Sequence, residues 1–268
     1  MRAGWAGRRI VGGIIGCMAE CESSAREPLA VFDVDGTLFR RGLLAALTRR
    51  LVNEGIFSER VRDELSRDYY AWVERRGSYE TYDELVVELF LRELKGVSVA
   101  ELRRCATVEV EAHGRRLHMY TRDVARRLEQ AGYHLIAISG SPREILELFL
   151  KPLGFDRAWG TVLAQDAGGC YTGEMLHDPF KNKRRVLEEF VRDAGVGLEG
   201  SVGMGDTLSD VGFLEMVRTP IAFNPNRSLL DVARQRDWPI VVERKDVIYN
   251  LQRRLEDPVL EAGTVWMG

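Results

Sequence analysis

The sequence has few cysteines, no long hydrophobic run and little excess charge. Its four cysteines are scattered, and Cys17 with Cys21 has no second pair or histidine cluster nearby to complete a zinc site. No stretch approaches the roughly 18 apolar residues of a membrane-spanning helix. The net charge of −3 gives no reason to expect nucleic acid or a membrane surface as a partner. We therefore expect a small-molecule partner and a reducing, cytoplasmic location.

The first 28 residues are predicted to form a disordered tail. They include RRIVGGIIGCM, in which two arginines precede a short, glycine-rich apolar run. This segment resembles a weak signal or lipoprotein sequence ending at Cys17, so export is the alternative to a cytoplasmic location. A start codon assigned too early, with Met18 as the natural first residue, is a further interpretation.

The rest of the chain divides into an α/β pattern and a helical insert. After a β-rich run at 29–39, residues 41–116 show four amphipathic helices with serine caps and glycine stops. From 117 onward helices alternate with short apolar strands, which requires parallel crossovers, whereas WGTVLAQDAGGCYTGEM is typical of a hairpin. The prediction is a doubly wound, Rossmann-like parallel-sheet core (29–40 and 117–250), an inserted helical module (41–116) and a tail (251–268).

Three predicted strands end in acidic or hydroxyl residues. These are Asp33 and Asp35 in VFDVDGTLF, Ser139 and Gly140 in ISGSP, and Asp206 and Asp210 in GDTLSD. In a doubly wound sheet the carboxyl ends of the strands form the ligand site. Two carboxylates as close in sequence as Asp33 and Asp35 repel each other unless a cation lies between them or one is protonated. The pair therefore indicates a metal site or an acid/base couple.

Carboxylates and nearby donors together suit a divalent cation and a phosphate group. Mg²⁺ binds one or two carboxylates and keeps water and substrate phosphate as its other ligands. Ser139, backbone amides beside glycine, and Lys183 at the start of a later helix are donors that complement phosphoryl oxygens. Lys181 is the alternative to Lys183, because the segment is basic throughout.

With these residues in this order, the sequence resembles the haloacid dehalogenase superfamily of phosphohydrolases. DVDGT is similar to its first motif, SGS to its second, Lys183 to its third and GDTLSD to its fourth. The helical insert resembles the type-one cap of the phosphoserine-phosphatase-like branch. The resemblance covers residues 29 to about 250. It implies an Mg²⁺-dependent phosphatase that hydrolyses a small phosphomonoester through an aspartyl-phosphate intermediate, and we expect a monomer or homodimer.

The resemblance also implies roles for the four aspartates. Asp33 is the expected nucleophile, and Asp35 the acid that protonates the leaving oxygen and later activates water. The side chains of Asp33 and Asp206 and the backbone carbonyl of Asp35 are the expected metal ligands. Asp210 is expected to support either the metal or the lysine.

The remaining motif residues are expected to bind the phosphoryl group. By the resemblance, Ser139 and Lys183 contact its oxygens, and Lys183 also offsets the charge of the phosphorylated Asp33. Thr37 and the backbone amides of Val34 and Gly140 assist. A phosphotransferase, which shares the first half of this reaction, and a phosphate-ligand sensor without turnover are the alternative functions.

One position departs from the phosphoserine-phosphatase pattern. Where those enzymes carry a glutamate that reads the substrate amine, this sequence has LFRRG, with Arg40 and Arg41. This weakens phosphoserine as the substrate and favours a ligand with additional negative charge, unless both arginines point into solvent. The aromatic residues of the insert are expected to belong to its core rather than to contact substrate: Tyr69, Tyr70, Trp72, Tyr79 and Tyr82.

Overall fold

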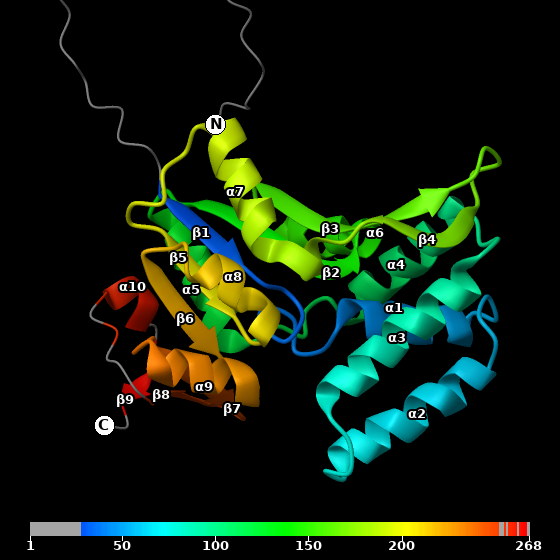
Figure 1. The fold of residues 1–268 in the computed structure, drawn as a ribbon, viewed down its shortest axis with the longest axis horizontal. Helices are drawn as coiled ribbons and strands as arrows, with labels where there is room; N and C mark the ends of the chain where they lie inside the picture. Colours follow the sequence, from blue (N-terminus) through cyan, green and yellow to red (C-terminus); the bar gives the residue numbers. More distant parts are fainter. Residues whose placement is uncertain (1–27, 252–254, 256, 262, 267–268) are drawn as a thin grey trace, which may run out of the picture.

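A single sheet runs through the computed structural model, which describes residues 28–251, 255, 257–261 and 263–266 (Figure 1). In these residues nine strands lie in the order β4-β3-β2-β1-β5-β6-β7-β8-β9. The six strands from β3 to β7 in that order are parallel. This confirms the predicted α/β class and its parallel-sheet core. The predicted disordered tail lies outside the described residues, apart from Pro28.

The parallel strands form the centre of the sheet, and antiparallel strands extend both of its sides. The parallel strands are β1 (Leu29–Phe32), β2 (His134–Pro142), β3 (Arg157–Gln165), β5 (Val202–Gly205), β6 (Thr219–Phe223) and β7 (Ile240–Arg244). On one side β4 (Tyr171–His177) runs antiparallel to β3, and on the other β8 (Val247–Asn250) runs antiparallel to β7. The pair β3 and β4 is the predicted hairpin.

Alternate residues of β1 face opposite sides of the sheet, and each side has its own apolar core. Ala30 and Phe32 pack beneath α5 (Met119–Gln130) and α6 (Arg143–Leu150). Leu29 and Val31 pack beneath the helices of the other face, which are α7 (Lys183–Ala194), α8 (Val211–Leu214) and α9 (Arg227–Gln235). Burial on both faces explains the continuous apolar run of this strand. Because the central strands are parallel, their carboxyl ends share one edge.

Four helices form the insert between β1 and α5. They are α1 (Leu43–Asn53), α2 (Arg60–Val73), α3 (Tyr79–Leu94) and α4 (Val99–His113), and no strand interrupts this fully described segment. Leu47, Leu51, Val86 and Leu102 are buried in the core that the insert shares with α5 and α6. Figure 1 shows α2 and α3 projecting beside the carboxyl ends of the parallel strands.

The tip of the β3–β4 hairpin is attached to the insert. The connection between α3 and α4 pairs with it through three backbone hydrogen bonds: Gly96 N to Tyr171 O at 2.8 Å, Tyr171 N to Val97 O at 2.9 Å, and Val99 N to Gly169 O at 3.1 Å. This hairpin extends from the core sheet to the far side of the insert (Figure 1). It therefore anchors the end of the insert opposite the turn between α2 and α3.

Residues 251–268, which were predicted only as a tail, contain two further elements. A short helix, α10 (Pro258–Glu261), packs Leu260 into the core, and its backbone carbonyl accepts a hydrogen bond from the buried Tyr120 hydroxyl at 2.9 Å. Strand β9 (Val265–Trp266) pairs with β8. Both elements are too short to show a hydrophobic period. None of the helices in the described residues has the length and hydrophobicity needed to cross a bilayer.

Candidate active site

Three carboxylates from two neighbouring strands converge on one buried lysine. Asp33 follows β1, and Asp206 and Asp210 follow β5, which lies next to β1 in the sheet. One oxygen from each carboxylate lies within 4.8 Å of the others. Lys183, the first residue of α7, is 2% exposed, and its Nζ donates to Oδ1 of Asp33 and Oδ1 of Asp210, both at 2.6 Å. The cluster thus holds three acidic groups and one ammonium group.

Two glycines allow the loops that carry these aspartates to approach each other. Gly36 has φ +86°, a left-handed conformation that favours glycine, and a Cβ there would overlap the Asp206 carboxylate. A Cβ on Gly205 would lie 2.5 Å from Cβ of Asp210. Any larger residue at either position would separate the carboxylates, which gives a physical reason for glycine beside aspartate in both motifs.

Asp210 has both of its oxygens engaged within the protein. Oδ1 accepts from Lys183, and Oδ2 accepts from the backbone N–H groups of Asp206 and Thr207, both at 2.9 Å. The carboxylate therefore fixes the lysine and the loop that carries Asp206. Of its two expected roles, this geometry favours support of the lysine.

Two buried polar atoms at the site have no hydrogen-bond partner among the described residues. They are Oδ2 of Asp33 and Oγ1 of Thr37. Burying such atoms unpaired is unfavourable, and it is most unfavourable for a carboxylate oxygen. The free oxygen of Asp33, with the neighbouring Asp206 carboxylate, offers the hard oxygen ligands that Mg²⁺ prefers. These residues therefore fit the expected metal, and the Thr37 hydroxyl is free for a ligand.

The charges of the cluster are strongly coupled. Burial raises the pKa of Asp33 to about 7, with Asp210 and Asp35 adding to the rise and Lys183 opposing it. Burial and the Asp33 and Asp210 carboxylates also raise the pKa of Asp206 well above its ordinary value. Burial alone would lower the pKa of Lys183, but Asp210 and Asp33 together hold it above its ordinary value. A bound cation would relieve the repulsion among the carboxylates.

Asp35 links the strand-end loop to the first helix of the insert. Its Oδ1 accepts from the backbone N–H of Leu43 at 2.6 Å, and its Oδ2 accepts from the Ser139 hydroxyl at 2.6 Å and the Ser141 hydroxyl at 2.9 Å. Leu43 begins α1, whose own N-cap residue, Gly42, has no side chain to accept such a bond. Asp35, in the same connection between β1 and α1, therefore serves as the cap of α1.

The predicted phosphoryl donors meet at the same edge of the sheet. Ser139 is fully buried next to Asp35. Gly140 packs closely on Phe180, because a Cβ added to Gly140 would lie 3.1 Å from Cβ of Phe180. The side chain of Lys181 is 77% exposed and its Nζ lies 3.8 Å from Asp178. Lys183, and not Lys181, therefore lies in the cluster.

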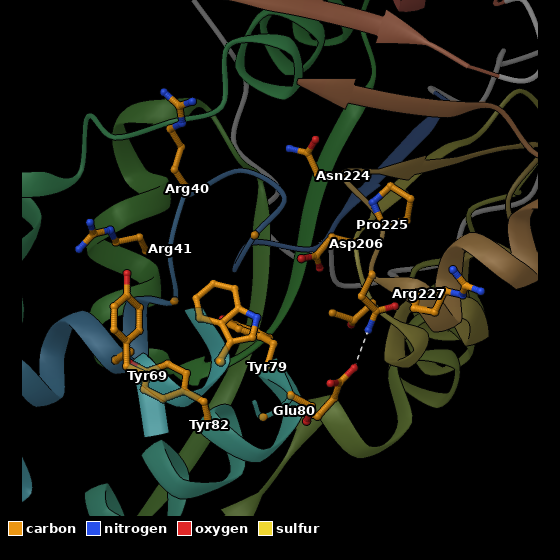
Figure 2. A pocket seen from close by; sticks show the side chains of 18 of the residues that line it. Arg40, Arg41, Tyr69, Tyr79, Glu80, Tyr82, Asp206, Asn224, Pro225 and Arg227 are labelled. Carbon is orange, nitrogen blue, oxygen red and sulfur yellow. Dashed lines mark hydrogen bonds between the residues drawn. The ribbon is translucent and has the colours of Figure 1, made fainter. Parts of the chain in front are cut away.

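A pocket of about 670 Å³ opens between the insert and the core beside Asp206. Figure 2 shows Arg40 and Arg41 on one side of it, Pro225 and Arg227 on the other, and Asp206 between them. Both arginines of LFRRG line this pocket, although Arg40 also lies 3.6 Å from the buried Glu243.

Several lining residues were not identified from the sequence as site residues. Arg49, Arg75 and Asn226 reach the pocket only through the packing of the insert against the core, and no local sequence signal marks them. The aromatic residues of α2 and α3 do pack edge to face with one another, as expected of a core. Four of them also line the pocket: Tyr69, Trp72, Tyr79 and Tyr82. Tyr70 is instead 58% exposed.

The fold and the site define a doubly wound α/β protein with an acidic cluster and a buried lysine at the carboxyl ends of its strands. The chain matches the model of the haloacid dehalogenase-like hydrolase family over residues 30–215 and belongs to this family. The expected resemblance is thereby confirmed.

Two relatives show how far the similarity extends. Over 208 residues the chain is 29% identical to a protein of Archaeoglobus fulgidus named phosphoserine phosphatase, covering 76% of this chain and 55% of that protein. Over 112 residues it is 33% identical to the inhibition of morphological differentiation protein of Streptomyces azureus, covering 41% of this chain and 40% of that protein. The chain thus spans about half the length of these relatives, or less.

Solved structures share the fold. A Bordetella pertussis protein of unknown function superposes with a TM-score of 0.66 at 23% identity, over 81% of this chain and 98% of that one. A substrate-bound phosphoserine phosphatase superposes with a TM-score of 0.55 at 20% identity, over 78% of this chain and 91% of that one. At these identities the likeness establishes the architecture alone.

Proposed function

We propose that the protein is an Mg²⁺-dependent phosphatase that hydrolyses a small phosphomonoester. The observation that carries the proposal is the buried Asp33 carboxylate, which has one oxygen on Lys183 and the other without a partner among the described residues. A nucleophile needs a free electron pair on a fixed atom, and this carboxylate supplies one: each of its oxygens has two lone pairs, so Asp33 can bind the metal and still keep a pair for the attack. Membership of a hydrolase family, and a relative named phosphoserine phosphatase, support the same reaction class.

In the first half of the proposed reaction, an oxygen of Asp33 attacks phosphorus and forms an aspartyl phosphate. The bond from phosphorus to the leaving oxygen breaks, and that oxygen takes a proton from Asp35. Lys183 holds Asp33 in place and balances negative charge on the transferring group, and Thr37 offers a hydroxyl donor. The Ser139 hydroxyl donates to Asp35, so it becomes a donor to the phosphoryl group only when that bond is exchanged. Mg²⁺, held by Asp33 and Asp206, would supply positive charge for the phosphoryl oxygens.

In the second half, water attacks phosphorus and gives its proton to Asp35. The bond between phosphorus and Asp33 then breaks, which restores both aspartates and releases phosphate. Both oxygens of Asp35 accept hydrogen bonds in the structure. Its acid and base roles therefore require that one of these bonds be exchanged for one to the substrate or to water.

The Asp33→Asn variant tests the nucleophile. We expect kcat for phenyl phosphate to fall at least about 1,000-fold, because an amide does not form the acyl phosphate. The variant should fold, since the substitution removes a buried charge from an acidic cluster. Phosphate release with Mg²⁺ and with EDTA, together with a thermal melt, measures both properties. Retained hydrolysis in the folded variant would remove Asp33 from the nucleophile role.

The reaction's acceptor distinguishes the proposal from its alternatives. Hydrolysis releases inorganic phosphate in buffer alone, whereas a phosphotransferase would form a phosphorylated alcohol when an acceptor is added. A phosphate-ligand sensor would bind without releasing either product. The cytoplasmic location and the monomeric or dimeric state stay predictions; fractionation of cells and light scattering of the purified protein test them.

A further inference from the structure

The pocket beside the acidic cluster is rich in arginine. Five of its lining residues are arginines, drawn from the loop after β1, from α1, from the turn between α2 and α3, and from α9: Arg40, Arg41, Arg49, Arg75 and Arg227. A cavity lined by one sign of charge attracts ligands of the opposite sign and concentrates them at its mouth. The phosphate group of a substrate could attract some of these arginines. However, the buried Lys183 already provides a positive charge at the expected phosphoryl position.

The guanidinium groups of two of these arginines have neither an ion pair nor a hydrogen bond with any described residue. Arg40 lies 3.6 Å from Glu243, Arg227 lies 3.4 Å from Asp231, and Arg49 hydrogen-bonds the Tyr82 hydroxyl. The remaining two are Arg41, in the loop that precedes α1, and Arg75, in the turn between α2 and α3. Their guanidinium groups are therefore available to a ligand in the pocket.

The aromatic side chains that line the pocket make no cation–π contact with Arg41 or Arg75 either. Cation–π contacts among the described residues join Arg157 to Phe190, Lys183 to Phe180 and Arg236 to Trp238, and none uses an arginine of the pocket. The aromatic rings of the pocket pack on one another instead. They form an aromatic wall of the pocket and leave the guanidinium groups of Arg41 and Arg75 without a ring partner.

The acidic residues that line the pocket offer little to a substrate amine. Apart from Asp206, the described lining contains one acid, Glu80, whose Oε1 accepts from Nδ2 of Asn226 at 3.0 Å (Figure 2). Asp206 belongs to the acidic cluster. Apart from Asp206, an ammonium group would thus meet five arginines and no carboxylate without a partner in the described lining.

We propose that the substrate is a phosphomonoester whose leaving group carries a second anionic group, and that Arg41 and Arg75 bind that group. Guanidinium groups bind carboxylate and phosphate alike through paired N–H donors, so the second group is one of these two. This inference rests on the proposed phosphatase function and specifies its substrate class.

Four aryl phosphates with one scaffold test the proposal. They are phenyl phosphate and its 4-carboxymethyl, 4-phosphonomethyl and 4-aminomethyl derivatives, whose methylene spacer keeps the leaving groups electronically similar. For the wild-type protein we expect kcat/KM to be about 10- to 100-fold higher for an anionic derivative than for phenyl phosphate, the effect of one or two charged hydrogen bonds. The aminomethyl compound should be the poorest. The better of the two anionic derivatives identifies carboxylate or phosphate.

Arg41→Gln and Arg75→Gln then locate the binding group. Each should lower kcat/KM about 10-fold or more for the preferred anionic substrate, while phenyl phosphate changes less than about twofold. Arg67→Gln is the matched control, because Arg67 is an exposed arginine of α2 that does not line the pocket. Equal losses on charged and uncharged substrates, or no preference for the anionic derivatives in the wild type, would overturn the proposal.

Calorimetric binding of the anionic derivatives separates this proposal from the phosphatase function. If the wild type binds them, both arginine variants weaken binding, and no substrate is hydrolysed, the anion site stands and the phosphatase fails. If phenyl phosphate is hydrolysed but the added anion improves neither binding nor kcat/KM, the phosphatase stands and the anion site fails.

Discussion

At the scale of single residues, Lys183 offsets the negative charge of the buried acidic cluster and so stabilises the folded protein. Its ammonium group donates to Asp33 and Asp210 from a position that is 2% exposed, and removing one partner of a buried ion pair leaves an uncompensated charge. We expect Lys183→Met to lower the free energy of unfolding by about 3–5 kcal/mol at pH 8 without Mg²⁺. The loss should be smaller at pH 5, because the carboxyls can then be protonated. Urea denaturation at both pH values measures this difference.

Lys181→Met is the control for this prediction, two residues away. The Lys181 side chain is 77% exposed, so its removal should change the free energy of unfolding by less than about 0.5 kcal/mol at either pH. A small, pH-independent loss in Lys183→Met would show that the lysine does not neutralise the cluster.

At the scale of secondary-structure elements, the site and the insert share hydrogen bonds at the start of α1. Asp35 accepts from Leu43 N, and the Ser141 hydroxyl accepts from Leu44 N at 3.1 Å while donating to Asp35. Losing a helix cap costs about 0.5–2 kcal/mol. We expect Ser141→Ala to lower stability by this amount and also to lower kcat, because Asp35 loses one of the donors that orient it.

Ser98→Ala separates the loss of stability from the loss of kcat. Ser98 caps α4 through a capping box and lies beside the hairpin tip rather than at the strand-end cluster. It should cost a similar free energy of unfolding and leave kcat unchanged. Thermal melts and steady-state kinetics on both variants give the comparison. If the two variants lose kcat equally, the link between α1 and Asp35 has no role in turnover.

The hairpin constrains how the insert can move relative to the core. Its tip is hydrogen-bonded to the connection between α3 and α4, whereas at the other end of the insert a side-chain hydrogen bond from Asn226 to Glu80 joins the start of α3 to the core across the pocket. An opening motion is therefore easiest at the turn between α2 and α3, where Arg75 lies. Opening there would uncover the pocket while the hairpin end stays attached.

At the scale of the whole molecule, the parts of the site that lie next to strands could be predicted, and the parts that depend on packing could not. Asp33, Ser139 and Asp206 are marked by the apolar runs that precede them and by the rule that strand ends share an edge. Arg75 lies in the turn between two helices, and its place in the pocket depends on how the insert packs against the core. Strand β9 is two residues long, which is too short for an alternating apolar pattern to predict it from the sequence.

The charge of the cluster makes the stability of the metal-free protein depend on pH. The pKa of Asp33 is about 7 in the folded protein against an ordinary value of 3.8, so between about pH 4 and 7 the folded state binds more protons than the unfolded state. The free energy of unfolding of the metal-free protein therefore falls as the pH rises through this window. The raised pKa of Asp206 acts in the same direction.

We expect magnesium to reverse this trend, because under the proposed function it binds the ionised carboxylates and must displace protons below pH 7. We expect 5 mM Mg²⁺ to raise Tm more at pH 8 than at pH 5.5, and its apparent Kd to rise about tenfold per pH unit below 7 for each proton displaced. Melts with Mg²⁺ and with EDTA at both pH values measure the effect. Asp206→Asn should remove most of the Mg²⁺ effect, whereas Glu59→Gln, at a side chain that is 84% exposed on the insert, should retain it. An equal rise in Tm at both pH values would mean that the ion binds away from the titrating cluster, because only sites that exchange protons for metal give this dependence.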